Sequence, residues 1–156
     1  MLKIGDKMPS FEVLDQDGNT VKSEDFIGKG RKTIIYFYPK DNTSGCTAEA
    51  CSFRDNYAEL TAAGYNVVGV SKDSSKSHTG FRAKYELPFR LLADTSTQML
   101  QDFGAWGEKK MSLLKRSDDR GVASGRSQMD FDWLSRLEFH VFSHHISRVL
   151  SIRPIR

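Results

Sequence analysis

One short run of residues limits the possible folds of this chain more than any other feature. Residues Thr33–Tyr38 are almost all β-branched or aromatic, and Pro39 ends the run. A run of this composition without polar alternation is typical of a strand that is covered on both faces. Because such strands occur mostly in parallel sheets with helices on either side, the run predicts an α/β fold.

The segments that follow alternate between strand and helix patterns. Strand patterns recur at 67–71 and 91–93, and apolar residues near helical spacing predict helices over about 46–63, 77–85 and 97–103. This β-α-β-α order predicts a mainly parallel sheet with helices on its faces. Before it, an Asp-Gly turn between residues 11–14 and 20–21 predicts an N-terminal hairpin.

Length and composition favour one domain. The 156 residues, 38% of them hydrophobic, are enough for one core but few for two. A coherent α/β pattern covers residues 1–111, whereas 112–156 differ in character: the body holds 11 lysines and 4 arginines, and the tail only Lys115 against seven arginines. We therefore interpret 112–156 as an aberrant tail, a shifted reading frame or a replaced terminus, in which 131–134 and 149–152 still have the pattern of short elements.

Several partners and locations are disfavoured. A formal net charge of +3 without a nucleic-acid motif argues against nucleic-acid binding. No apolar stretch reaches the roughly 20 residues that cross a bilayer, and the first residues do not have the pattern of a signal peptide. We expect a soluble, cytoplasmic protein that binds no membrane.

Cys46 and Cys51 are the only cysteines. In a reducing compartment a close pair more often serves redox or metal chemistry than a permanent crosslink, although both could instead be small buried hydrophobes. Cys46 stands where the helix is expected to begin, and the positive end of a helix dipole favours the thiolate, the nucleophilic form. Thr43 offers a hydroxyl to the sulfur or to an incoming oxygen, and Pro39 constrains the loop.

The spacing of the two cysteines has a structural consequence. Five residues along an ideal helix separate Cα atoms by roughly 8 to 9 Å, beyond the limit of about 7 Å for a disulfide. A Cys46–Cys51 bond therefore requires the first helical turns to unwind. The spacing also disfavours a Cys-x-x-Cys centre, and a zinc site would lack two ligands nearby.

Other polar and aromatic residues are interpreted as structural. His78 lies in a polar helix start and is expected on the surface, while Trp106, Phe103 and Tyr36 are expected in the core or in the wall of a site. The tail histidines are interpreted as incidental, because no carboxylate or cysteine completes a metal site; they are His140, His144 and His145.

The pattern Pro39-x-x-x-Thr43-x-x-Cys46 resembles the signature that peroxiredoxins carry around their peroxidatic cysteine. With Cys51 five residues on, the segment is similar to the bacterioferritin-comigratory or Q-type branch. The resemblance covers residues 2–111 and implies a thioredoxin-like fold, a central sheet flanked by helices.

The resemblance also implies a function. Cys46 would reduce hydrogen peroxide and organic hydroperoxides and become a sulfenic acid, and Cys51 would condense with it to a disulfide. Thioredoxin or a similar dithiol would reduce that disulfide, in an enzyme of antioxidant defence that needs no metal or organic cofactor and is expected to be a monomer. The alternative is a non-catalytic thioredoxin-fold sensor or binding protein that has lost its C-terminal half-site.

The tail departs from this family. Members continue with an arginine that supports the thiolate, then two strands and a closing helix; Arg116 and Arg120 fall near the expected place, but neither is assigned the role. We expect the missing strands to leave an unpaired sheet edge, low stability and slowed peroxide reduction.

Overall fold

The computed structural model describes residues 6–26 and 30–106, together with the backbone of 148–152. Its elements are β1 (Glu12–Asp15), β2 (Thr20–Lys22), a 3-10 helix η1 (Ser23–Phe26), β3 (Lys32–Phe37), α1 (Ser44–Asp55), α2 (Tyr57–Ala62), β4 (Tyr65–Ser71), α3 (Ser75–Tyr85), β5 (Arg90–Ala93), α4 (Gln98–Asp102) and β6 (Arg148–Ile152). The predicted hairpin and the strands at 33–38, 67–71 and 91–93 are confirmed within one or two residues.

The strands form one sheet in the order β2-β1-β5-β4-β3-β6. Strand β4 lies parallel to both β3 and β5, whereas β1 is antiparallel to β2 and β5, and β6 is antiparallel to β3. The expectation of a mainly parallel sheet is therefore wrong. Only the strands joined through covering helices run parallel, and the hairpin and the last strand add antiparallel pairs on either side.

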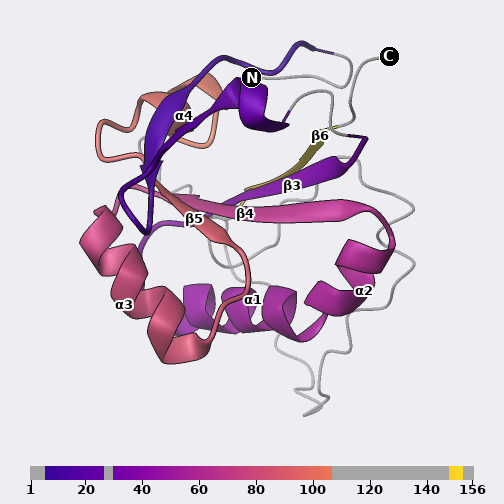
Figure 1. Ribbon diagram of the computed structural model, residues 1–156. Helices are drawn as coiled ribbons and strands as arrows, with labels where there is room; N and C mark the ends of the chain where they lie inside the picture. The colour runs from indigo at the N-terminus through magenta and orange to yellow at the C-terminus, as the bar shows by residue number, and fades with distance from the viewer. Residues whose placement is uncertain (1–5, 27–29, 107–147, 153–156) are drawn as a thin grey trace, which may run out of the picture.

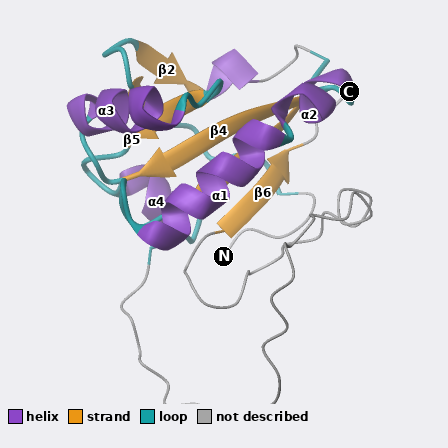
Figure 2. Ribbon diagram, turned by 90° about the horizontal axis from the view of Figure 1, so that it is seen from below, coloured by secondary structure: helices purple, strands orange, loops and turns teal. Residues whose placement is uncertain are grey.

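Helices α1, α2 and α3 cover one face of the sheet, and α4 lies on the other (Figures 1 and 2). A buried cluster of side chains lies on each face of the sheet, between the strands and the elements that cover that face. The helix-side cluster contains Ile34, Tyr36, Tyr38, Cys46, Ala50, Phe53, Leu60, Val67, Phe81, Leu87, Phe89 and Leu91. The hairpin-side cluster contains Phe11, Val21, Ile35, Phe37, Val68, Val70, Leu92, Met99, Leu100 and Phe103. Because successive side chains of β3 alternate between faces, one short strand contributes to both.

The single helix predicted over 46–63 is two helices. Asn56 interrupts it with φ −100° and ψ 6°, and the Asn56 side chain donates a hydrogen bond of 2.9 Å to the carbonyl of Ser52. Asparagine competes in this way for backbone groups of a helix. The break separates α1, which carries both cysteines, from α2.

The expectation of an unpaired sheet edge is wrong at β3. The backbone of Arg148–Ile152 pairs with all but the first residue of β3, from Phe37 opposite Arg148 to Thr33 opposite Ile152. The pattern at 149–152 is thus a strand, and β3 is an internal strand of the sheet. The rest of the tail, including the pattern at 131–134, the three tail histidines and both candidate arginines, lies outside the described residues.

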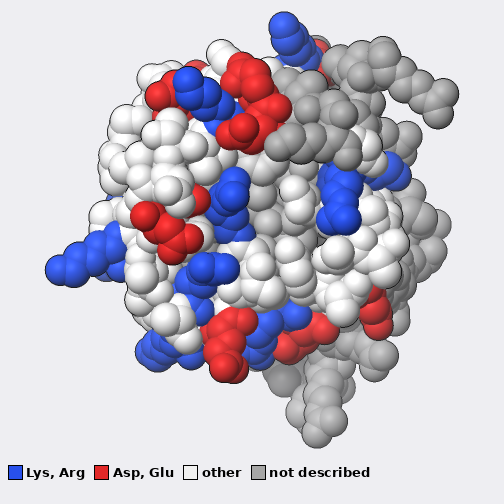
Figure 3. Space-filling view, in the orientation of Figure 1, with Lys and Arg blue, Asp and Glu red and all other residues white. Residues whose placement is uncertain are grey.

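Charged side chains of both signs are interspersed over the described surface in Figure 3. This face therefore presents no large patch of one sign over those residues, the feature by which nucleic-acid surfaces are recognised. Within the described ranges, no helix combines the length and apolar character needed to cross a bilayer.

Candidate active site

Cys46 is the third residue of α1, as the sequence predicts for a cysteine near a helix start. Thr43 is the N-cap, with extended backbone at φ −81° and ψ 152°, and its carbonyl accepts the first helical bond from the amide of Thr47 at 2.9 Å. The Cys46 side chain is buried, only 2% of the residue being exposed, and Cys51 is half-buried. Both are free thiols in this structure.

Pro39 and Thr43 lie in the loop that joins β3 to α1. Pro39 is exposed and follows the end of β3 by two residues, where its missing N–H removes no ladder bond. The Thr43 hydroxyl donates to the carbonyl of Lys40 at 3.2 Å and makes no side-chain capping bond. This contact closes the loop locally; the roles of Thr43 and Pro39 toward a bound peroxide remain predictions.

Cys46 and Cys51 lie in one continuous α-helix. Helical geometry at this spacing places the two Cα atoms roughly 8 to 9 Å apart, which is too far for a disulfide. Bond formation thus requires α1 to unwind between the cysteines. Burial of Ala50 and Phe53 in the helix-side cluster opposes that unwinding.

Tyr36 lies in the cluster that also holds Cys46, and its hydroxyl has no hydrogen-bond partner among the described residues. Its ring stacks on Phe53, with 4.7 Å between centroids, and its oxygen lies over Gly69, where an added Cβ would stand only 2.7 Å away. Burial, followed by the negative charge of Glu49, raises the pKa of Tyr36 well above its ordinary value. This phenol is therefore neutral and costs free energy as an unsatisfied buried donor.

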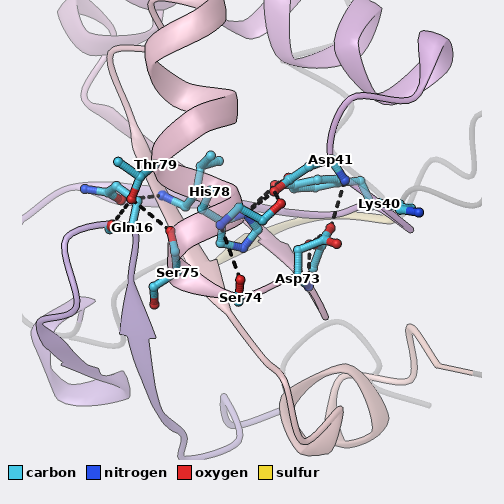
Figure 4. Close-up of polar contacts among 12 residues, drawn as sticks. Gln16, Lys40, Asp41, Asp73, Ser74, Ser75, His78 and Thr79 are labelled. Carbon is cyan, nitrogen blue, oxygen red and sulfur yellow. Dashed lines mark hydrogen bonds and ion pairs between the residues drawn. The ribbon is translucent and has the colours of Figure 1, made fainter.

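A buried polar network beside the cysteine loop was missed by the sequence interpretation (Figure 4). Asp41, two residues after Pro39, receives hydrogen bonds from the Tyr38 hydroxyl at 2.7 Å and the Ser77 hydroxyl at 2.7 Å. His78 Nδ1 lies 2.8 Å from Asp41 Oδ2, and its Nε2 lies 3.1 Å from the carbonyl of Leu92. The network thereby joins the loop to α3 and β5.

His78 is buried, with none of its surface exposed, so its expected position on the surface is wrong. Its spacing from Phe81 and Tyr85 is i, i+3 and i+7, which places all three on one face of α3. That spacing was the available signal. Trp106, expected in the core or a wall, is 48% exposed with Lys72 over its ring, whereas Phe103 and Tyr36 are buried as predicted.

The ionisation of Asp41 follows from its hydrogen bonds. Both ring nitrogens of His78 face oxygen atoms, Oδ2 of Asp41 and the carbonyl of Leu92. Burial pushes the pKa of Asp41 up, but hydrogen bonds from His78, Ser77 and Tyr38, with the charge of His78, hold it below its ordinary value. Asp41 is therefore held in its ionised form, with its Oδ2 2.8 Å from Nδ1 of the buried His78.

Comparison with known proteins identifies the family. The AhpC/TSA family model matches residues 4–122. The chain is 46% identical over 152 residues to peroxiredoxin Bcp of Escherichia coli K12, with 92% of this chain and 91% of that protein covered. It is 44% identical over 132 residues to a putative peroxiredoxin bcp of Coxiella burnetii, with 79% and 86% covered.

Solved structures agree. The BcpB peroxidoxin of Mycobacterium tuberculosis superposes with a TM-score of 0.63 at 32% identity, covering 67% of each chain. A Xanthomonas campestris bacterioferritin comigratory protein, studied for alkyl peroxide reduction, superposes with a TM-score of 0.61 at 34% identity, and the match spans 63% of that chain. The chain therefore belongs to the AhpC/TSA family of thioredoxin-fold peroxiredoxins. Within that family its relatives place it in the Bcp or PrxQ branch.

Proposed function

We propose that this chain is a thiol peroxidase that reduces hydrogen peroxide and organic hydroperoxides through Cys46. The main support for the proposal is the position of Cys46 in the first turn of α1, after the loop that contains Pro39 and Thr43. Unpaired N–H groups of a helix start stabilise a thiolate there. The Escherichia coli and Coxiella relatives, named as peroxiredoxins, support the same chemistry.

The reaction has two covalent steps on this chain. The Cys46 thiolate attacks one peroxide oxygen, so a sulfur–oxygen bond forms, the oxygen–oxygen bond breaks, and an alcohol or water leaves after protonation. Cys51, as a thiolate, then attacks the sulfenic sulfur; the disulfide forms and hydroxide leaves as water. Thioredoxin or a similar dithiol then reduces the Cys46–Cys51 disulfide to two thiols by thiol–disulfide exchange. The dithiol supplies the two electrons and is itself oxidised to a disulfide.

The test is steady-state peroxide consumption with thioredoxin and its reductase. Wild type should turn over, Cys46→Ser should lose all activity, and Cys51→Ser should consume one equivalent of peroxide and then stop or slow severely. Mass spectrometry should find the Cys46–Cys51 linkage after oxidation of the wild type. Unchanged turnover in Cys46→Ser would sink the assignment, and stoichiometric oxidation of wild type without turnover would favour a redox sensor.

A further inference from the structure

The Asp41–His78 pair lies outside the steps just described, yet it is attached to the loop that presents Cys46. Asp41 stands five residues before Cys46 and two before the N-cap Thr43. Its backbone amide donates to Asp73 Oδ2 at 2.8 Å, its Oδ1 accepts from Tyr38 within the same loop, and its Oδ2 contacts Ser77 and His78 of α3. Side chain and backbone of one residue therefore both attach the loop to α3 and to the residues just before it.

The anchor reaches the first turns of α3. Ser77 and His78, both on that helix, bind the same oxygen of Asp41, and the far side of the His78 ring meets the carbonyl of Leu92 in β5. The side chains of His78 and Asp41 are 0% and 2% exposed. Removing a partner from a buried, hydrogen-bonded carboxylate is costly, so this attachment is stiff.

A second attachment lies at the other end of α1. Arg54 donates through Nη1 to the carbonyl of Tyr85, the last residue of α3, at 2.8 Å. The segment from Asp41 to Arg54, which contains both cysteines, is therefore hydrogen-bonded to α3 at each of its ends. Asn42, with φ of 59°, follows the first anchor directly.

We propose that Asp41 and His78 are positioning residues that hold the cysteine loop on α3 while the first turns of α1 unwind for disulfide formation. The proposal rests on the proposed function. Attack on peroxide needs Cys46 held at the loop, whereas attack by Cys51 needs α1 to open. A fixed point at Asp41 confines the opening to residues after it and leaves the loop through Asp41 in place for the next peroxide.

The two steps respond differently when the anchor is lost. In His78→Gln and Asp41→Asn the loop is freed, so peroxide attack should fall about tenfold, the order expected when a reacting group is misplaced by a fraction of an ångström. Formation of the disulfide from the sulfenic acid should stay within about twofold of wild type, because the unwinding lies after the anchor and does not break it. Attack is measured by trapping the sulfenic acid in a Cys51→Ser background, and disulfide formation by quenched mass spectrometry at saturating peroxide.

Asp94→Asn is the matched control. Asp94 is an equally buried carboxylate, but it accepts hydrogen bonds from the amide of Leu100 and the hydroxyl of Ser96 at the start of α4. In the folded fraction of Asp94→Asn, the rates of peroxide attack and of disulfide formation should both equal those of wild type, because this variant loses stability without freeing the cysteine loop. Tyr38→Phe removes the 2.7 Å bond to Asp41 and a 3.4 Å contact with His78 Nδ1, but leaves the contact between Asp41 and His78 in place. It should slow attack in the same direction by less, which keeps the test open should His78→Gln not fold.

Equal effects on both steps, or no effect on attack in folded variants, would overturn the proposal. Amide exchange separates it from the proposed function. In reduced protein His78→Gln should speed exchange at the amide of Asp41, which Asp73 protects, without changing exchange in β4. If wild type forms no sulfenic acid, the proposed function fails, and the exchange result still shows whether the anchor exists; without faster exchange at Asp41, the anchor is refuted.

Discussion

The two faces of the sheet differ in chemistry. All ten members of the hairpin-side cluster are apolar, whereas the helix-side cluster contains Cys46 and two tyrosines. The hydroxyl of Tyr36 has no hydrogen-bond partner within the described part of the chain, and that of Tyr38 donates to Asp41 of the Asp41–His78 pair. Burial of apolar side chains leaves no hydrogen bond unmade, whereas burial of a polar group without a partner costs free energy. The hairpin-side cluster therefore contributes apolar packing alone, while the helix-side cluster gives up some stability to polar groups around the cysteine that we propose as the nucleophile.

The largest effect should come from one aromatic truncation on each face. Phe37 and Phe53 are equally buried, one in each cluster. Phe37→Ala and Phe53→Ala should each lower the free energy of unfolding by about 3 to 5 kcal/mol in denaturant titrations. Only Phe53→Ala should also speed disulfide formation, because Phe53 packs α1 against Tyr36. Equal acceleration by Phe37→Ala would remove the distinction between the faces.

Oxidation should change amide exchange in α1 but not in the sheet, and both can be measured in one sample. Formation of the Cys46–Cys51 disulfide should speed amide exchange over about residues 44 to 54 by roughly tenfold or more, because α1 must unwind. Amides of β4 serve as the internal reference and should keep their protection. Identical exchange in reduced and oxidised protein would contradict the unwinding step, even with the bond present.

A smaller effect should follow from two hydroxyl deletions on the helix side. Tyr36→Phe removes an unsatisfied donor and should raise the free energy of unfolding by about 1 kcal/mol. Tyr38→Phe removes the donor to Asp41 and should lower it by about the same amount. Thermal unfolding of the pair measures both; shifts of the same sign would mean that the hydroxyl environments are not as different as their contacts indicate.

The smallest effect concerns acid. The pKa of Asp41 is lower in the folded chain than its ordinary value of 3.8, so ionised Asp41 stabilises the fold above that pH. This contribution is lost as the pH falls through the lower folded pKa. The gap in unfolding free energy between wild type and Asp41→Asn should therefore narrow as the pH falls below about 4. A gap that widens in acid would reverse the sign assigned to Asp41.

Local patterns were enough to predict most elements and the place of Cys46 near a helix start. The run at 33–38, the turn at 15–19 and the helix start at Cys46 depend on neighbours in sequence, and all three appear where they were expected. The break at Asn56 was missed because the apolar spacing continues through it into α2. The antiparallel pairing of β6 was also missed, since strand partners far apart in the chain leave little local trace.

By itself, the sequence determined the motif around Cys46, because backbone geometry at a helix start is set by adjacent residues. It also determined that the two cysteines cannot bond without unwinding, since their spacing is a property of one helix. Only the tertiary structure decided that Asp41 and His78, 37 positions apart, form a buried pair beside that motif. Aspartate and histidine are not typical core residues, and their polar groups can be buried only when the fold brings them together with Tyr38 and Ser77.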